Sequence, residues 1–78
     1  MRTVQIDREP VELYKIIKFE GIAASGAEAK QIIAEGLVTI NGDVEMRKRR
    51  KMVAGDTVRV FDDEFVLAIT GETAVSGE

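Results

Sequence analysis

The chain has 78 residues, enough for one small domain but not for two hydrophobic cores. It contains no cysteine and no histidine, which excludes disulfide bonds, thiolate or histidine zinc sites and histidine acid–base catalysis. The net charge of −3 argues against non-specific coating of a nucleic acid. Polar residues follow Met1 and no apolar run approaches ~20 residues, so we expect a cytoplasmic protein with no membrane association.

The first third of the chain predicts a short strand and then a helix. Residues 4–6 alternate apolar and polar side chains, as a strand does. Pro10 suits the first turn of a helix over residues 11–20, and Gly21 is expected to end it. The apolar side chains of this helix share one face: Leu13, Ile16 and Ile17.

A second helix is predicted to start at a capping box. Residues 25–28 read Ser-Gly-Ala-Glu, in which the serine is the N-cap and the glutamate occupies position N3. The buried face would carry Ala29, Ile32 and Ile33, and Gly36 would end the helix. The short connection over residues 21–24 should make the two helices pack as a pair.

Residues 37–40 are a strand by composition, and the Asn41-Gly42 pair after them is the strongest short hairpin signal in a sequence. A two-residue loop would pair Thr39 with Val44 and Leu37 with Met46. Val38 and Ile40 would then lie on the opposite face, so the register stays open at this point.

The last third predicts two further strands. Gly55-Asp56 indicates a turn before a strand over residues 57–61, and a second strand is expected over residues 65–69. The acidic residues 62–64 between them are interpreted as a solvated turn and not as a metal site. Residues 70–78 are expected to form a flexible tail, so that the domain spans residues 1–69.

Five consecutive cations, Arg47–Lys51, hold nearly half of the chain's 11 basic residues. We call them the basic run; its members are Arg47, Lys48, Arg49, Arg50 and Lys51. A strand would turn alternate side chains to opposite faces, so the run fits an exposed loop or edge better. It could present phosphate-binding guanidinium and ammonium groups to a polyanion. It could equally be a solvated edge strand or a nuclear-localisation-like signal.

In order and spacing these parts resemble the RNA-binding domain of ribosomal protein S-four, the αL motif. The resemblance covers about residues 12–60, and the chain is most similar to the small stand-alone bacterial members of the YbcJ type. It is carried by the capped start of the second helix, its glycine end, the strand with its Asn-Gly turn, and the later Gly-Asp: Ser25 to Lys30, Ile33, Glu35-Gly36, Val38, Ile40 to Gly42, Gly55-Asp56 and Val58. Where the family often has an arginine after the N-cap serine, this chain has Gly26.

The resemblance implies an α+β fold, in which a two-helix pair packs on a small, mainly antiparallel sheet. It also implies a non-catalytic, monomeric protein, without metal or cofactor, that contacts the phosphates of structured RNA of the ribosomal or transfer RNA class. The implied RNA surface is the start of the second helix with the basic run beside it: Ser25, Gly26, Lys30 and Arg47–Lys51. On local evidence an ordinary exposed helix lysine is the slightly favoured interpretation of Lys30, and Ser25 serves first as a cap.

Other functions are weaker interpretations of the same residues. The aromatic residues fall within apolar patterns away from the basic run, which disfavours a base-stacking platform: Tyr14, Phe19, Phe61 and Phe65. DNA is a less expected ligand than structured RNA, which is recognised through shape and phosphate. A protein–protein adaptor of the translation machinery is the main alternative. The residues do not indicate an enzyme, because the chain has no histidine or cysteine and no paired carboxylates at a recognisable spacing.

Overall fold

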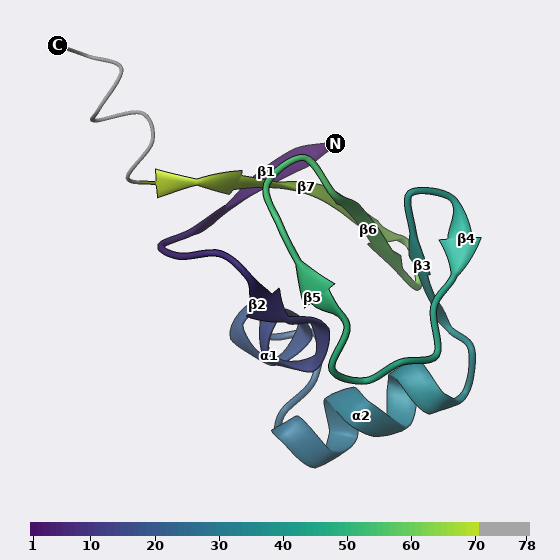
Figure 1. Ribbon diagram of the computed structural model, residues 1–78. Helices are drawn as coiled ribbons and strands as arrows, with labels where there is room; N and C mark the ends of the chain where they lie inside the picture. The colour runs from purple at the N-terminus through teal and green to yellow at the C-terminus, as the bar shows by residue number, and fades with distance from the viewer. Residues whose placement is uncertain (71–78) are drawn as a thin grey trace, which may run out of the picture.

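The computed structural model describes residues 1–70, with two helices on one side of a small β-sheet. Figure 1 shows the helices together at one end of the molecule and the main sheet at the other. A short two-stranded sheet, β2–β5, lies beside α1. In chain order the elements are β1 (Arg2–Ile6), β2 (Val11–Glu12), α1 (Leu13–Phe19), α2 (Gly26–Ala34), β3 (Val38–Ile40), β4 (Asp43–Val44), β5 (Lys51–Met52), β6 (Thr57–Val60) and β7 (Asp63–Ile69).

Helix α1 begins later than the sequence predicts. Residues 11–12 pair with residues 51–52 as the strands β2 and β5, so Pro10 precedes a strand and is not in the first turn of a helix. The backbone groups that would have started the helix here are used in tertiary pairing instead. The predicted end is confirmed, because Gly21 has φ +77° and its N–H donates to the carbonyl of Lys18.

Helix α2 starts and ends as predicted. The Ser25 hydroxyl oxygen accepts a hydrogen bond from the Glu28 N–H at 3.2 Å, and the Glu28 carboxylate accepts one from the Ala24 N–H at 2.7 Å. These reciprocal bonds form the N-terminal cap. Gly36 follows the helix with φ +77°, and the buried face is the expected one: Ala29, Ile32 and Ile33.

The β3–β4 hairpin settles the register that the sequence left open. Thr39 pairs with Val44 and Ile40 pairs with Asp43, so the loop consists of the two residues Asn41 and Gly42, both with positive φ. The side chains of Val38 and Ile40 face the core, while Val44 and Met46 are exposed. This part of the sheet is therefore covered on one face only.

The main sheet has the order β1-β7-β6-β3-β4. Among the strand pairs of this sheet within residues 1–70, only β1–β7 is parallel, which confirms the prediction of a mainly antiparallel sheet. The sequence did not indicate that the first strand pairs with the last. Strand β7 starts at Asp63, so the acidic residues 62–64 belong partly to a strand and are not all turn.

The core lies between the helices and the inner face of the sheet. Its largest fully buried side chains come from both layers: Leu13, Ile16, Ile17, Ile33, Val38, Ile40, Met52, Val58, Val60, Phe65 and Leu67.

Thr70, the last described residue, donates a hydrogen bond from its hydroxyl to the Gln5 side chain at 3.3 Å. The predicted tail lies, from residue 71 onward, outside the described residues. Neither helix within residues 1–70 is long and apolar enough to cross a bilayer.

Candidate nucleic-acid interface

The first four residues of the basic run form a loop, exposed except for the partly buried Arg50, and Lys51 is the first residue of β5; the sequence favoured an exposed loop or edge. The Arg50 N–H donates to the Arg47 carbonyl at 3.3 Å, which closes a turn. Because of this turn the side chains do not alternate between two faces. Four of the five cations line one open hollow on the surface: Arg47, Arg49, Arg50 and Lys51.

The backbone of the basic run is attached to the start of α1. The Leu13 N–H donates to the Arg50 carbonyl at 2.9 Å, and the Tyr14 N–H donates to the Lys48 carbonyl at 3.1 Å. In the part of the chain that the structure describes, the side chain of the N-cap residue Glu12 makes no capping bond, so these carbonyls satisfy first-turn amides of the helix. The run was predicted beside the start of the second helix, but its direct hydrogen bonds go to the first.

Glu45 is the buried centre of the basic run's side-chain contacts. It is 7% exposed and accepts four hydrogen bonds, which come from the Arg47 N–H at 2.9 Å, Arg47 Nε and Nη2 at 3.0 Å each, and Arg50 Nη1 at 2.8 Å. The bonds from Arg47 and then Arg50 lower the pKa of Glu45 to about 2, and the carboxylate raises the pKa of Arg47. We call Glu45, Arg47 and Arg50 the Glu45 cluster.

Sequence reasoning missed Glu45. The available signal was a single carboxylate two residues before five cations, in a hairpin whose strand was expected to be half-buried. If the loop after such a carboxylate folds back on it, the cations of the loop surround the carboxylate. The structure shows that it does fold back, because Arg50, five residues later, reaches the same carboxylate as Arg47.

The other three cations of the basic run are held less tightly. Arg49 is exposed, and its Nε lies 4.0 Å from the Glu12 carboxylate, which also contacts Lys15 Nζ at 3.4 Å. Within residues 1–70 neither Lys48 nor Lys51 forms an ion pair. The run therefore has two parts: two arginines bound to Glu45, and three cations with little or no internal compensation.

Tyr14 connects the start of α2 with the basic run. Lys30 Nζ lies 4.6 Å from the centroid of the Tyr14 ring, and a Cβ atom at Gly26 would come within 3.5 Å of that ring. The Tyr14 backbone binds Lys48, as described above. The prediction that this aromatic residue lies away from the basic run was therefore wrong. Gly26 and Lys30 lie beside the Tyr14 ring, and the Tyr14 backbone is hydrogen-bonded to the basic run. The Ser25 hydroxyl is used in the helix cap.

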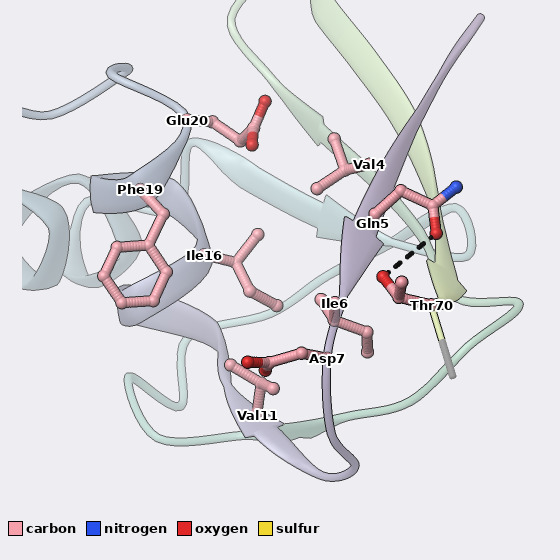
Figure 2. Close-up of a pocket in the computed structure, with 9 residues that line it drawn as sticks. All are labelled: Val4, Gln5, Ile6, Asp7, Val11, Ile16, Phe19, Glu20 and Thr70. Atoms are coloured by element: carbon pink, nitrogen blue, oxygen red, sulfur yellow. Dashed lines mark hydrogen bonds between the residues drawn. The ribbon is translucent and has the colours of Figure 1, made fainter. Parts of the chain in front are cut away.

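A second hollow lies between β1 and α1, and it has the opposite character. Figure 2 shows Val4 and Ile6 on β1 facing Ile16 and Phe19 on α1. Among residues 1–70, its charged lining residues are the carboxylates Asp7 and Glu20, which pair with Arg8 and Arg2 outside the lining. This apolar groove therefore has no excess positive charge that would attract phosphate.

The two-helix pair on a mainly antiparallel sheet, with a basic loop attached to the first helix, is the αL architecture of an RNA-binding class of domain. A profile of the S4 domain family matches residues 4–68, and the chain belongs to this family. The family resemblance found in the sequence is thereby confirmed.

Two curated relatives match most of the chain. The protein named "Putative RNA-binding protein YbcJ" of Escherichia coli (strain K12) is 52% identical over 59 residues, which are 74% of this chain and 84% of that protein. "Probable ribosome maturation protein RlbA" of Bacillus subtilis (strain 168) is 32% identical over 57 residues, which are 73% of this chain and 80% of that protein. These names denote RNA binding and ribosome maturation, not an enzymatic reaction.

A solved structure shares the fold. The solution structure of E. coli YbcJ, described as containing an αL motif involved in RNA binding, superposes with a TM-score of 0.67 at 45% identity. The match covers 87% of each chain. The predicted α+β fold is confirmed by this likeness.

Proposed function

We propose that this protein is a non-catalytic, cytoplasmic RNA-binding protein that acts as a monomer. It contacts the phosphates of structured RNA through the basic run and the start of α2. The observation that carries the proposal is the hollow lined by Arg47, Arg49, Arg50 and Lys51 on a domain of the S4 family. Guanidinium and ammonium groups gathered around one concave surface match a phosphate backbone, even on a chain with net charge −3.

The exposed surface supports recognition by shape and phosphate, not by base stacking. The Tyr14 ring beside the basic run already contacts Lys30 and packs against Gly26. Phe19 is strongly exposed; it lines the hollow of Figure 2 and also a neighbouring hollow whose charged lining residues are Asp7, Arg8, Glu12, Lys15 and Lys51. Single-strand binders combine a basic groove with several open aromatic faces. The ring nearest the basic run, that of Tyr14, is already in contact with Lys30, which favours a folded RNA.

The start of α2 is a smaller part of the proposed surface. The capping box uses the Glu28 N–H, whereas the N–H groups of Gly26 and Ala27 have no acceptor among residues 1–70. Helix N-terminal amides are suitable phosphate donors. Gly26 supplies no cation there and Lys30 already contacts a ring, so most of the positive charge must come from the basic run.

Ribosomal RNA is the class of ligand that we favour over transfer RNA. The support is the B. subtilis relative, whose name assigns that protein to ribosome maturation. The two proteins align over 57 residues, which are 73% of the present chain and 80% of that relative.

The alternative function is a protein–protein adaptor of the translation machinery. Three exposed apolar side chains on or beside the β3–β4 hairpin, which precedes the basic run in the chain, favour it: Leu37, Val44 and Met46. An adaptor would retain its partners after ribonuclease treatment in a pull-down, whereas an RNA-binding protein would lose them.

The central test removes cations that do not hold the fold together. Lys48→Ala/Arg49→Ala leaves the Glu45 cluster intact, and the matched control Lys18→Ala/Arg59→Ala removes the same charge from exposed positions on α1 and β6. With roughly four phosphate contacts, the logarithm of affinity for a ribosomal RNA hairpin should fall with the logarithm of salt concentration at a slope of about −3. The first variant should bind about tenfold more weakly and reduce the slope by about 1.5.

The control should bind within about twofold of the wild type. Equal loss in both variants would show that only net charge matters, and unchanged binding by Lys48→Ala/Arg49→Ala would overturn the proposed surface. A parallel titration of duplex DNA at the same salt concentration separates RNA from DNA as the ligand.

A further inference from the structure

Glu45 lies where the basic run is anchored to both layers of the fold. Its backbone N–H donates to the Val38 carbonyl at 2.9 Å, which attaches it to β3. Its carboxylate binds Arg50, and the Arg50 carbonyl accepts the bond from the Leu13 N–H of α1. The orientation of the two arginines bound to Glu45 is therefore set by the sheet and the first helix together.

The Glu45 carboxylate has little capacity left for other partners. A carboxylate offers about four lone-pair sites, and here it accepts four hydrogen bonds. An exposed negative charge in the middle of a basic loop would repel phosphate. This one is almost fully buried and compensated by two guanidinium groups, so the repulsion at the surface is small.

The two arginines keep donors for a ligand. A guanidinium has five N–H donors; Arg47 uses two of them on Glu45, and Arg50 uses one. The Arg47 side chain is 74% exposed, so its remaining donors are open to solvent. Because Glu45 already fixes their orientation, less side-chain entropy is lost when a phosphate binds.

We infer that Glu45 is a positioning residue that sets specificity for folded RNA. It holds Arg47 and Arg50 in one orientation toward the ligand, and it lowers the positive charge of the basic run by one. The inference rests on the proposed function. Its consequence is that Glu45 opposes binding of unstructured polyanions, which require only charge, and supports binding of a folded RNA, whose phosphates stand at fixed positions.

Glu45→Gln tests this because it keeps the shape of the side chain and removes its charge. The matched control is Glu64→Gln, which makes the same change at an exposed position on β7. Affinity is measured for a ribosomal RNA hairpin and for single-stranded poly(U) at one salt concentration. We expect the preference for the hairpin to fall about tenfold in Glu45→Gln, which corresponds to one well-oriented charge-assisted contact, and to stay within about twofold in Glu64→Gln.

An unchanged preference in Glu45→Gln, or an equal fall in Glu64→Gln, would overturn the positioning role. A second readout does not depend on RNA. In the free wild-type protein, NMR should show slower exchange with water for the Arg47 Nε–H, which is hydrogen-bonded to Glu45, than for the Nε–H of the exposed Arg8. Arg8 Nε lies 3.6 Å from Asp7 Oδ1, which is too far for a hydrogen bond. This difference should disappear in Glu45→Gln.

The two readouts separate the two claims. Exchange at Arg47 as fast as at Arg8 in the wild type would overturn the role of Glu45 even if the hairpin binds. Failure of the wild type to bind the hairpin would overturn the proposed function, and with it the specificity role, even if exchange at Arg47 is slow.

Discussion

The arginine–carboxylate clusters around Arg2 and around Glu45 have opposite charge balances. In the Arg2 cluster one arginine holds two carboxylates: Arg2 Nε and Nη2 donate to the Asp63 carboxylate at 3.2 and 2.7 Å, and Nη1 donates to Glu20. In the Glu45 cluster one carboxylate holds two arginines. The Arg2 cluster therefore carries a charge of −1, and the Glu45 cluster carries +1.

The difference separates a structural cross-link from one that can also serve a ligand. Arg2 joins β1 to the start of β7 and to the end of α1, and its guanidinium lies 4.9 Å from the centroid of the Phe65 ring. Its excess of negative charge would repel phosphate. The Glu45 cluster uses the same two kinds of side chain but has one more guanidinium than carboxylate. It lies at the hollow lined by the basic run, where its excess positive charge would attract phosphate.

The largest effect is expected when Glu45 loses both cations. Arg47→Ala/Arg50→Ala leaves a buried carboxylate without compensation, which should lower the free energy of unfolding by about 3 kcal/mol and abolish most hairpin binding. Urea unfolding and RNA titration measure the two effects. Adding Glu45→Ala should recover part of the stability but none of the binding. If the triple variant were less stable than the double variant, the carboxylate would not be the source of the loss.

The next effect is a dependence of stability on pH. The pKa of Glu45 is lowered in the folded protein from an ordinary value near 4.5 to about 2. The ionised carboxylate thus stabilises the fold fully above about pH 5, and this contribution decreases below pH 4.5 and is lost as the pH falls through about 2. The stability difference between wild type and Glu45→Gln should follow the same course in urea unfolding from pH 2 to pH 7.

A stability difference that is constant over this range would contradict the assignment. The hydrogen bond from Arg2 also lowers the pKa of Asp63. The loss of stability caused by Asp63→Asn should therefore also disappear at acid pH, where the carboxylate of the wild type is protonated. RNA affinity should distinguish the two variants, because only Glu45→Gln should alter the preference for the hairpin.

The smallest effect is expected from Arg2→Lys. Lysine keeps the charge but loses both the paired contact with Asp63 and the stacking over Phe65. The urea midpoint should fall by less than in Arg47→Ala/Arg50→Ala, and hairpin affinity should stay within about twofold of the wild type. A larger loss of RNA affinity than of stability would show that the Arg2 cluster also serves the ligand.

The local elements of the fold could be predicted because local residues cause them. The Ser25–Glu28 cap, the glycine helix ends and the Asn41-Gly42 hairpin were each placed correctly. The start of α1 was placed wrongly because a distant segment, residues 51–52, pairs with residues 11–12. The parallel pairing of β1 with β7 has no local signal at all, since it depends on how the whole chain packs.

For the candidate site, composition identified the cations but not their contacts. The basic run was expected to be an exposed loop, and it is one. Arg47 and Arg50 differ from the other three cations because both donate to the Glu45 carboxylate, and this contact depends on the turn between residues 47 and 50. The contact of Lys30 with Tyr14 likewise depends on how α1 crosses α2. Whether these residues bind RNA remains a prediction.

The parallel β1–β7 pair has a consequence for synthesis on the ribosome. Strand β1 emerges before the other described elements of the domain, and its partner β7 is made about sixty residues later, because Arg2 pairs with Phe65. The helix pair and the β3–β4 hairpin can form as soon as they are made, because their contacts are close in sequence. The nascent chain must therefore hold β1 unpaired until almost the whole domain has emerged, and the Arg2 cluster can close only then.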